Sequence, residues 1–152
     1  AAEALAGKAW GEGQAKRFRH WVRLTGAWAL LAGVMYTMLF LFAGNPLTAL
    51  LTDLDSVRRA VAAVMPLVIM LPLVSVWCFH FDGVYIGATA AGAMMITMGL
   101  AFVLYLLLLD PMTSRWGIAG LWGAVLVFMA ARGLAQWIWY PFMLRRIPVS
   151  GV

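Results

Sequence analysis

The stretch Phe81–Thr89, which reads FDGVYIGAT, joins two long apolar runs and decides how this sequence is interpreted. It contains Asp82, the only acidic side chain within residues 56–109. The flanking runs, 60–81 and 83–109, contain no other charged residue if histidine is neutral. A helix that crosses the hydrocarbon core of a bilayer needs about 20 mainly apolar residues. Each run is therefore long enough to cross a membrane.

The composition excludes a soluble domain. Hydrophobic residues make up 64% of the 152 residues and charged residues 11%, whereas soluble domains are about half apolar and a quarter charged. The formal net charge of +5 does not indicate nucleic-acid binding, because the basic residues lie at the edges of apolar runs and form no continuous stripe. With the single cysteine Cys78 no intrachain disulfide can form, and no phosphate-binding loop or nucleophile elbow occurs. We expect no enzyme activity, no cofactor and no metal site.

The apolar runs predict an all-α, polytopic membrane helix bundle with four transmembrane helices. Their approximate ranges are 22–51, 58–81, 90–109 and 116–144. Residues 1–21 are expected to be the end of a preceding helix and a basic loop, and residues 145–152 a tail. Asp110–Ser114 has turn-forming residues and predicts the link between the last two spans. A charged, helix-like opening without Met suggests a fragment of a longer protein.

The distribution of Lys and Arg predicts the orientation. One side of the membrane receives seven basic residues, and they are Lys8, Lys16, Arg17, Arg19, Arg23, Arg145 and Arg146. The other side receives three, and they are Arg58, Arg59 and Arg115. The side richer in Lys and Arg is generally cytoplasmic. Both ends of the chain are therefore expected in the cytoplasm, which an even number of spans requires.

Asp82 and Arg132 are the candidate ion pair. At 1.5 Å per helical residue, Asp82 lies about 34 Å below Arg59 and Arg132 about 24 Å below Trp116, both toward the inner side. A charged Arg at that depth needs a partner or must reach the headgroups. The pair could be an inner gate made or broken during transport, or a permanent clamp between two helices. Alternatively, Asp82 could cap the next helix at Gly83.

Other candidates have a functional and a structural interpretation. Flexible Met and aromatic side chains could line an adaptable substrate cavity, and the candidates are Met35, Tyr36, Met38, Met65, Met70 and Trp77. Packing in a membrane core explains most methionines equally well. His80 could relay protons, because histidine titrates near physiological pH, but a buried, hydrogen-bonded histidine is the commoner case.

Four motifs occur in an order that resembles a known family. They are Ala1–Lys8 (AAEALAGK), Leu50–Asp53 (LLTD), Phe81–Thr89 (FDGVYIGAT) and Ala130–Leu134 (AARGL). Together they resemble the DinF-like branch of the multidrug and toxic compound extrusion (MATE) family over nearly the whole chain. The resemblance implies a twelve-helix transporter with two six-helix lobes. The four spans would correspond to about helices 9–12, within the C-terminal lobe.

The same resemblance implies a function. MATE transporters export drug-like cationic or amphipathic molecules by exchange with protons or sodium ions, through alternating access of the two lobes. In this branch the acidic residue most often linked to proton coupling lies on helix one of the N-terminal lobe, so the coupling site is expected outside this chain. The implied partners are the bilayer, a drug-like substrate and the missing lobe, in a bacterial inner membrane. The alternatives are a lipid-linked glycan flippase of the wider superfamily and a small structural membrane subunit.

Overall fold

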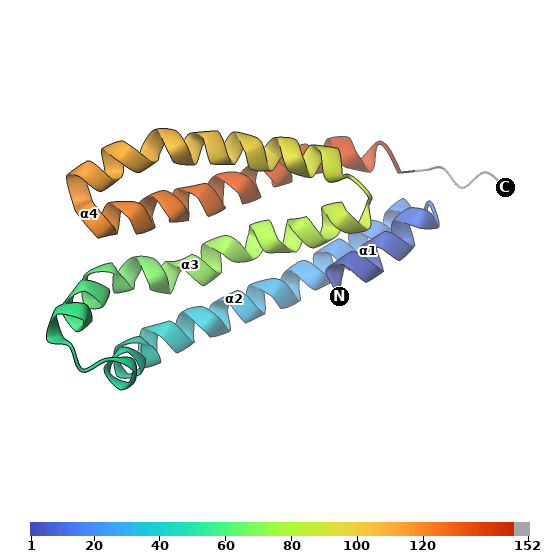
Figure 1. Ribbon diagram of the computed structural model, residues 1–152. Helices are drawn as coiled ribbons and strands as arrows, with labels where there is room; N and C mark the ends of the chain where they lie inside the picture. Colours follow the sequence, from blue (N-terminus) through green and yellow to red (C-terminus); the bar gives the residue numbers. More distant parts are fainter. Residues whose placement is uncertain (148–152) are drawn as a thin grey trace.

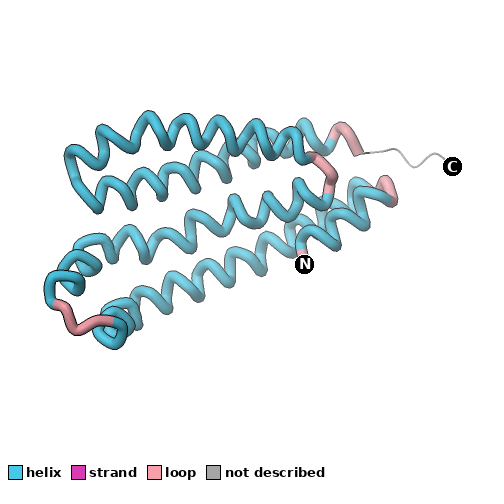
Figure 2. Tube along the Cα trace, viewed as in Figure 1, coloured by secondary structure: helices cyan, strands magenta, loops and turns pink. Residues whose placement is uncertain are grey.

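The computed structural model describes residues 1–147, and within this range the chain is helical with short connections and no strand (Figures 1 and 2). The four helices are α1 (Ala2–Gly11), α2 (Ala15–Leu51), α3 (Asp55–Gly87) and α4 (Ala91–Leu144). The predicted all-α fold class is confirmed. The predicted tail 145–152 is described only as far as residue 147, and its remainder lies outside the described residues.

Helix α4 is a hairpin of two arms, 91–116 and 118–144, which run back along each other in Figure 1. The reversal is at Gly117, whose φ of 56° and ψ of −129° are not helical. Only glycine adopts this conformation without steric cost. The predicted link at Asp110–Ser114 is therefore wrong, because this segment is helical despite Pro111. The hydroxyl of Thr113 donates to the carbonyl of Leu109 at 2.7 Å, which binds this turn to the preceding one.

Helices α2 and α3 are longer than the apolar runs predict. Helix α2 begins at Ala15 rather than near residue 22, and α3 continues to Gly87 rather than ending near residue 81. Both additions lie where α1 packs against them, so tertiary contact extends the helices beyond their apolar runs. Asp82 consequently lies inside α3, and the expectation that it caps the next helix at Gly83 is wrong.

Among the described residues, α2, α3 and α4 are long and apolar enough to cross a membrane. Each arm of α4 exceeds the about 20 residues that a span requires. The three helices thus provide four segments of membrane-spanning length, and the predicted membrane helix bundle is confirmed.

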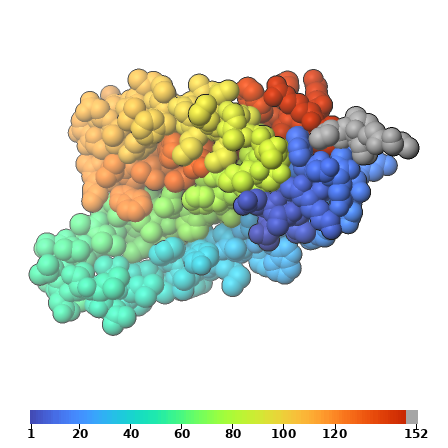
Figure 3. Space-filling view, turned by 45° about the vertical axis from the view of Figure 1, so that its right-hand side comes forward, coloured from blue at the N-terminus to red at the C-terminus, as the bar shows by residue number. Residues whose placement is uncertain are grey.

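Helix α3 lies at the centre of the bundle, between α2 and the α4 hairpin (Figure 1). The buried core is concentrated at the end where α1, the start of α2, the end of α3 and the end of α4 meet. Phe18, Val84 and Tyr85 are fully buried there. In Figure 3 the blue N-terminal segment lies against the yellow-green segment, beside the red end of α4. We call this region the basic end, because it carries the basic residues of 8–23.

Two glycines allow α1 to approach α3 closely at the basic end. A Cβ on Gly87 would lie 2.9 Å from the amide nitrogen of Gly7, and a Cβ on Gly7 would lie 3.1 Å from the carbonyl oxygen of Gly87. Real Cβ atoms essentially never show the first of these distances and seldom show the second. Small residues at such positions let membrane helices pack backbone to backbone, so α1 is fixed against the last turns of α3.

Candidate functional site

A buried polar cluster joins α3 to the second arm of α4 near the basic end. One Nη of Arg132 donates to Oδ2 of Asp82, and Nε2 of Gln136 donates to Oδ1 of Asp82 at 2.7 Å. The side chains of Arg132 and Asp82 are only 9% and 14% exposed. Each carboxylate oxygen of Asp82 therefore has its own donor. Two sequence candidates, Asp82 and Arg132, are brought together by the fold.

The cluster forms because α3 and α4 come close together here. A Cβ on Gly133 would lie 3.3 Å from the amide nitrogen of Cys78, which is closer than most Cβ contacts, so glycine favours this helix separation. Tyr85, one turn after Asp82, donates its hydroxyl to the carbonyl of Gln136 at 2.8 Å. Asp82 and Tyr85 thus bind the same two turns of α4, and the contact resists sliding of one helix along the other.

Gln136 and Tyr85 were not identified from the sequence. The available signal was spacing, because Gln136 follows Arg132 by four residues and such residues share one face of a helix. Hydrogen bonds to charged groups contribute more than neutral ones, about 1.5–3 kcal/mol. Gln136 is thus as much a part of the cluster as Arg132.

The cluster keeps unused hydrogen-bonding capacity. Nε of Arg132 and Oε1 of Gln136 are buried and have no partner among the described residues. Buried polar atoms in proteins usually have a partner. Nε–H of Arg132 can therefore donate one further hydrogen bond and Oε1 of Gln136 can accept one, without any change in the bonds to Asp82.

His80 faces a different helix. It is buried, at 7% exposure, and its Nε2 would lie 3.2 Å from a Cβ on Gly26 of α2. Asp82 instead bonds to side chains of α4. His80 and the polar cluster therefore lie on different faces of α3, and the described contacts include no hydrogen bond between them.

The six cavity candidates do not share one cavity among the described residues. Met35, Tyr36 and Met38 line a hollow of about 660 Å³ formed entirely by the outer face of α2. Met65 is buried between helices, where its sulfur would lie 2.8 Å from a Cβ on Gly44. Met70 is about half exposed on α3. Trp77 alone lines a groove between helices, described below.

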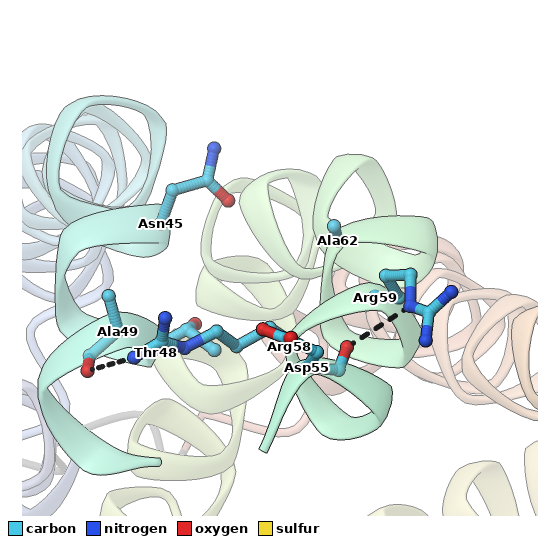
Figure 4. Close-up of a pocket in the computed structure, with 7 residues that line it drawn as sticks. All are labelled: Asn45, Thr48, Ala49, Asp55, Arg58, Arg59 and Ala62. Atoms are coloured by element: carbon cyan, nitrogen blue, oxygen red, sulfur yellow. Dashed lines mark hydrogen bonds between the residues drawn. The ribbon is translucent and has the colours of Figure 1, made fainter. Parts of the chain in front are cut away.

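The opposite end of the bundle carries a second polar hollow, of about 650 Å³, between the last turns of α2 and the first turns of α3 (Figure 4). Its most prominent side chain, Arg58, donates to the carbonyls of Thr52 at 2.8 Å and Ala49 at 3.0 Å. These are the carbonyls that the end of α2 leaves without partners. Arg58 therefore closes the end of α2 and has few donors left for a ligand.

A metal site has no support in the described part of the chain, where no group of three or more His, Cys, Asp or Glu side chains comes together. Both oxygens of Asp82 already accept bonds from Arg132 and Gln136. The chemistry available to the cluster is the formation or breaking of an ion pair.

The fold and the buried ion pair define a polytopic α-helical membrane protein. The chain belongs to the MatE family, whose profile matches residues 1–112. It is 33% identical over 136 residues to DNA damage-inducible protein F of Escherichia coli (strain K12), in an alignment that covers 89% of this chain and 29% of that protein. The chain thus spans less than a third of the length of this relative. No solved structure matches the chain. The resemblance inferred from the four motifs is confirmed, and the family consists of transporters rather than enzymes.

Proposed function

We propose that this chain is part of the C-terminal lobe of an exporter that moves amphipathic or cationic small molecules out of a bacterial cell. Transport is driven by protons or sodium ions moving the opposite way, and a second lobe completes the central cavity. The observation that carries the proposal is the MatE match across segments long enough to span a membrane. The ion-coupling residue lies outside this chain.

The arrangement of the helices supports an orientation with both ends of the segment in the cytoplasm. Helix α1, the start of α2 and the end of α4 lie together in Figure 1, while the α2–α3 connection and the reversal of α4 lie at the other end. The basic residues of 8–23 therefore gather on one side with Arg145 and Arg146. An excess of Lys and Arg favours the cytoplasmic side.

Within this lobe, the Asp82–Arg132 pair acts as a permanent clamp rather than as a gate that opens in each cycle. Three observations support the clamp: both side chains are largely buried, Gln136 occupies the second carboxylate oxygen, and Tyr85 bonds one turn away. Opening the pair would leave two buried charges without an opposite charge beside them, which is costly in a membrane. A clamped lobe moves as one rigid body, as alternating access by rocking lobes requires.

The transport proposal is tested on the full-length gene. Cells that lack their own exporters would express it, and accumulation of a fluorescent cationic dye would be followed while proton and sodium gradients are collapsed separately. We expect expression to lower dye accumulation, and removal of one of the two gradients to abolish the effect. If neither gradient matters, or if no cationic or amphipathic dye is exported, the proposal is wrong.

The clamp is tested by exchanging the two charges in the full-length protein. Asp82→Asn and Arg132→Gln should each lower the amount of folded protein, and the double exchange Asp82→Arg with Arg132→Asp should partly restore it together with transport. A gate predicts the reverse, namely single variants that fold normally but do not transport. Folded protein is measured by size-exclusion chromatography of the detergent-solubilised protein.

A further inference from the structure

A groove opens at the basic end between α2 and the second arm of α4, with α3 as its floor. Its volume is about 560 Å³. Helix α2 contributes Arg19 and Arg23, α3 contributes Trp77 and Phe81, and α4 contributes Trp137 and Tyr140. The groove therefore has cationic side chains on one wall and aromatic rings on the floor and the opposite wall.

The groove continues into an apolar hollow between α3 and α4. This hollow, of about 470 Å³, shares Trp77, Phe81 and Trp137 with the groove and extends along α3 to Leu73. Leu73 is eight residues before Phe81, which is about 12 Å along a helix. The combined groove is thus positively charged at one end. Its apolar part, from Phe81 to Leu73, is about as long as part of an acyl chain.

The two arginines of the groove are not neutralised within the described chain. Neighbouring Arg17 pairs with Glu12 at 3.2 Å, whereas Arg19 and Arg23 form no ion pair with any described residue. None of the described residues that line the groove is acidic. Two adjacent cations at the edge of an apolar helix, with no acid facing them, attract an anion.

We propose that this groove is a specific binding site for one anionic phospholipid of the surrounding leaflet. The phosphate lies between Arg19 and Arg23, and an acyl chain follows the rings of Trp77 and Trp137 toward Leu73. Basic pockets between helices at the cytoplasmic surface suit anionic headgroups, and aromatic rings suit the interface below them. The site requires that the helices lie in a membrane, but it does not depend on the transport activity.

The test uses the purified full-length protein in detergent, with lipid binding measured by native mass spectrometry. Phosphatidylglycerol is compared with phosphatidylcholine of the same acyl chains, so that only the headgroup differs. The double variant Arg19→Gln/Arg23→Gln should bind phosphatidylglycerol at least about tenfold more weakly than the wild type. The control Lys16→Gln/Arg17→Gln removes the same charge outside the groove and should change binding less than about twofold. Arg19→Lys/Arg23→Lys should retain most of the binding.

A second measurement does not depend on the variants folding. A phosphatidylglycerol with a photoreactive group on its acyl chain should label the peptides that contain Trp77 or Trp137 in the wild type, and excess unlabelled phosphatidylglycerol should suppress the labelling. The proposal is overturned if phosphatidylcholine competes equally well. It is also overturned if the groove variant binds like the wild type, or if an acidic residue elsewhere in the full-length protein pairs with Arg19 or Arg23 and no lipid binds.

Discussion

The two ends of the bundle are built differently. At the basic end, α1 covers the last turns of α3, and Phe18, Val84 and Tyr85 are fully buried. At the opposite end, Leu50 and Leu51 are 82% and 83% exposed. The same apolar composition thus forms a packed core at one end and an open surface at the other.

The comparison shows what holds membrane helices together. Lipid tails are as apolar as leucine, so an exposed leucine costs little, and helices associate through close packing and polar contacts. The basic end, or the region next to it, has both, as the Gly7–Gly87 contact and the Asp82 cluster. The opposite end also has close packing, of Gly120 against Met112, but its ion pair between Arg58 and Asp53 is exposed. We therefore expect the loss of a buried polar contact near the basic end to cost far more stability than the loss of an exposed one at the opposite end.

The largest effect is expected when Asp82 loses its charged partner. Arg132→Met leaves a buried carboxylate with Gln136 as its remaining side-chain donor, and breaking a buried ion pair in this way costs about 3–5 kcal/mol. The matched control, Arg115→Met, removes an exposed arginine at the opposite end and should cost less than about 0.5 kcal/mol. Thermal unfolding of the full-length protein in detergent measures both. Equal effects would show that the two ends do not differ.

A smaller loss of stability is expected when a methyl group is added at the close contact between α1 and α3. Gly87→Ala places a methyl group against backbone atoms of Glu3 and Gly7, and such overpacking costs about 1–3 kcal/mol. Gly92→Ala is the matched control, because nothing lies within 4 Å of its Cβ. It should stabilise the helix by about 0.5–1 kcal/mol. Opposite shifts in the unfolding temperature are expected, and two shifts of the same sign would refute this contact.

Removal of the second donor to Asp82 should cost less than removal of Arg132. Gln136→Leu deletes the 2.7 Å bond to Oδ1, which we expect to cost about 1.5 kcal/mol. Gln14→Leu, in the exposed turn before α2, should be nearly neutral. When Gln136→Leu is introduced into the Arg132→Met variant, its cost in unfolding free energy should differ from its cost in the wild type. The reason is that Arg132 and Gln136 share one carboxylate. A double-mutant cycle on the unfolding free energy measures this, and exact additivity would show that the residues act independently.

The smallest effect is expected at the opposite end. Arg58→Gln removes bonds to the carbonyls of Thr52 and Ala49 and an exposed ion pair with Asp53, and it should cost less than about 1 kcal/mol. Hydrogen exchange should increase locally in the α2–α3 connection and not at the basic end. A loss of stability as large as that of Arg132→Met would contradict the contrast between the ends.

The number and nature of the spans were predictable, because apolar runs of membrane length have few alternatives to helix. The residues at which the spans begin and end were not predictable. The Asp110–Ser114 segment has the residues of a turn but is helical, and the chain reverses at Gly117, where only glycine accepts the backbone angles. The ends added to α2 and α3 depend on contact with α1, which no local pattern describes.

The candidate site was predictable in part. Depth along the helices indicated that Asp82 and Arg132 could meet, because few other charges lie at that level. The participation of Gln136 and Tyr85 depends on how α3 and α4 rotate and approach around Gly133. The six cavity candidates do not share one cavity among the described residues for the same reason, since composition does not say which face of a helix turns toward which neighbour.

The sequence by itself determined that the chain is a membrane helix bundle, because hydrophobic length and the scarcity of charge leave few other solutions. Its resemblance to the MatE family rested on four motifs in order, and the family match confirms it. Only the tertiary structure decided which faces meet. A polar side chain in a helix is costly unless a partner reaches it, and that partner is set by the rotation and separation of two helices. The sequence therefore shows that Asp82 requires polar partners, and the fold brings Arg132 and Gln136 within hydrogen-bonding distance of it.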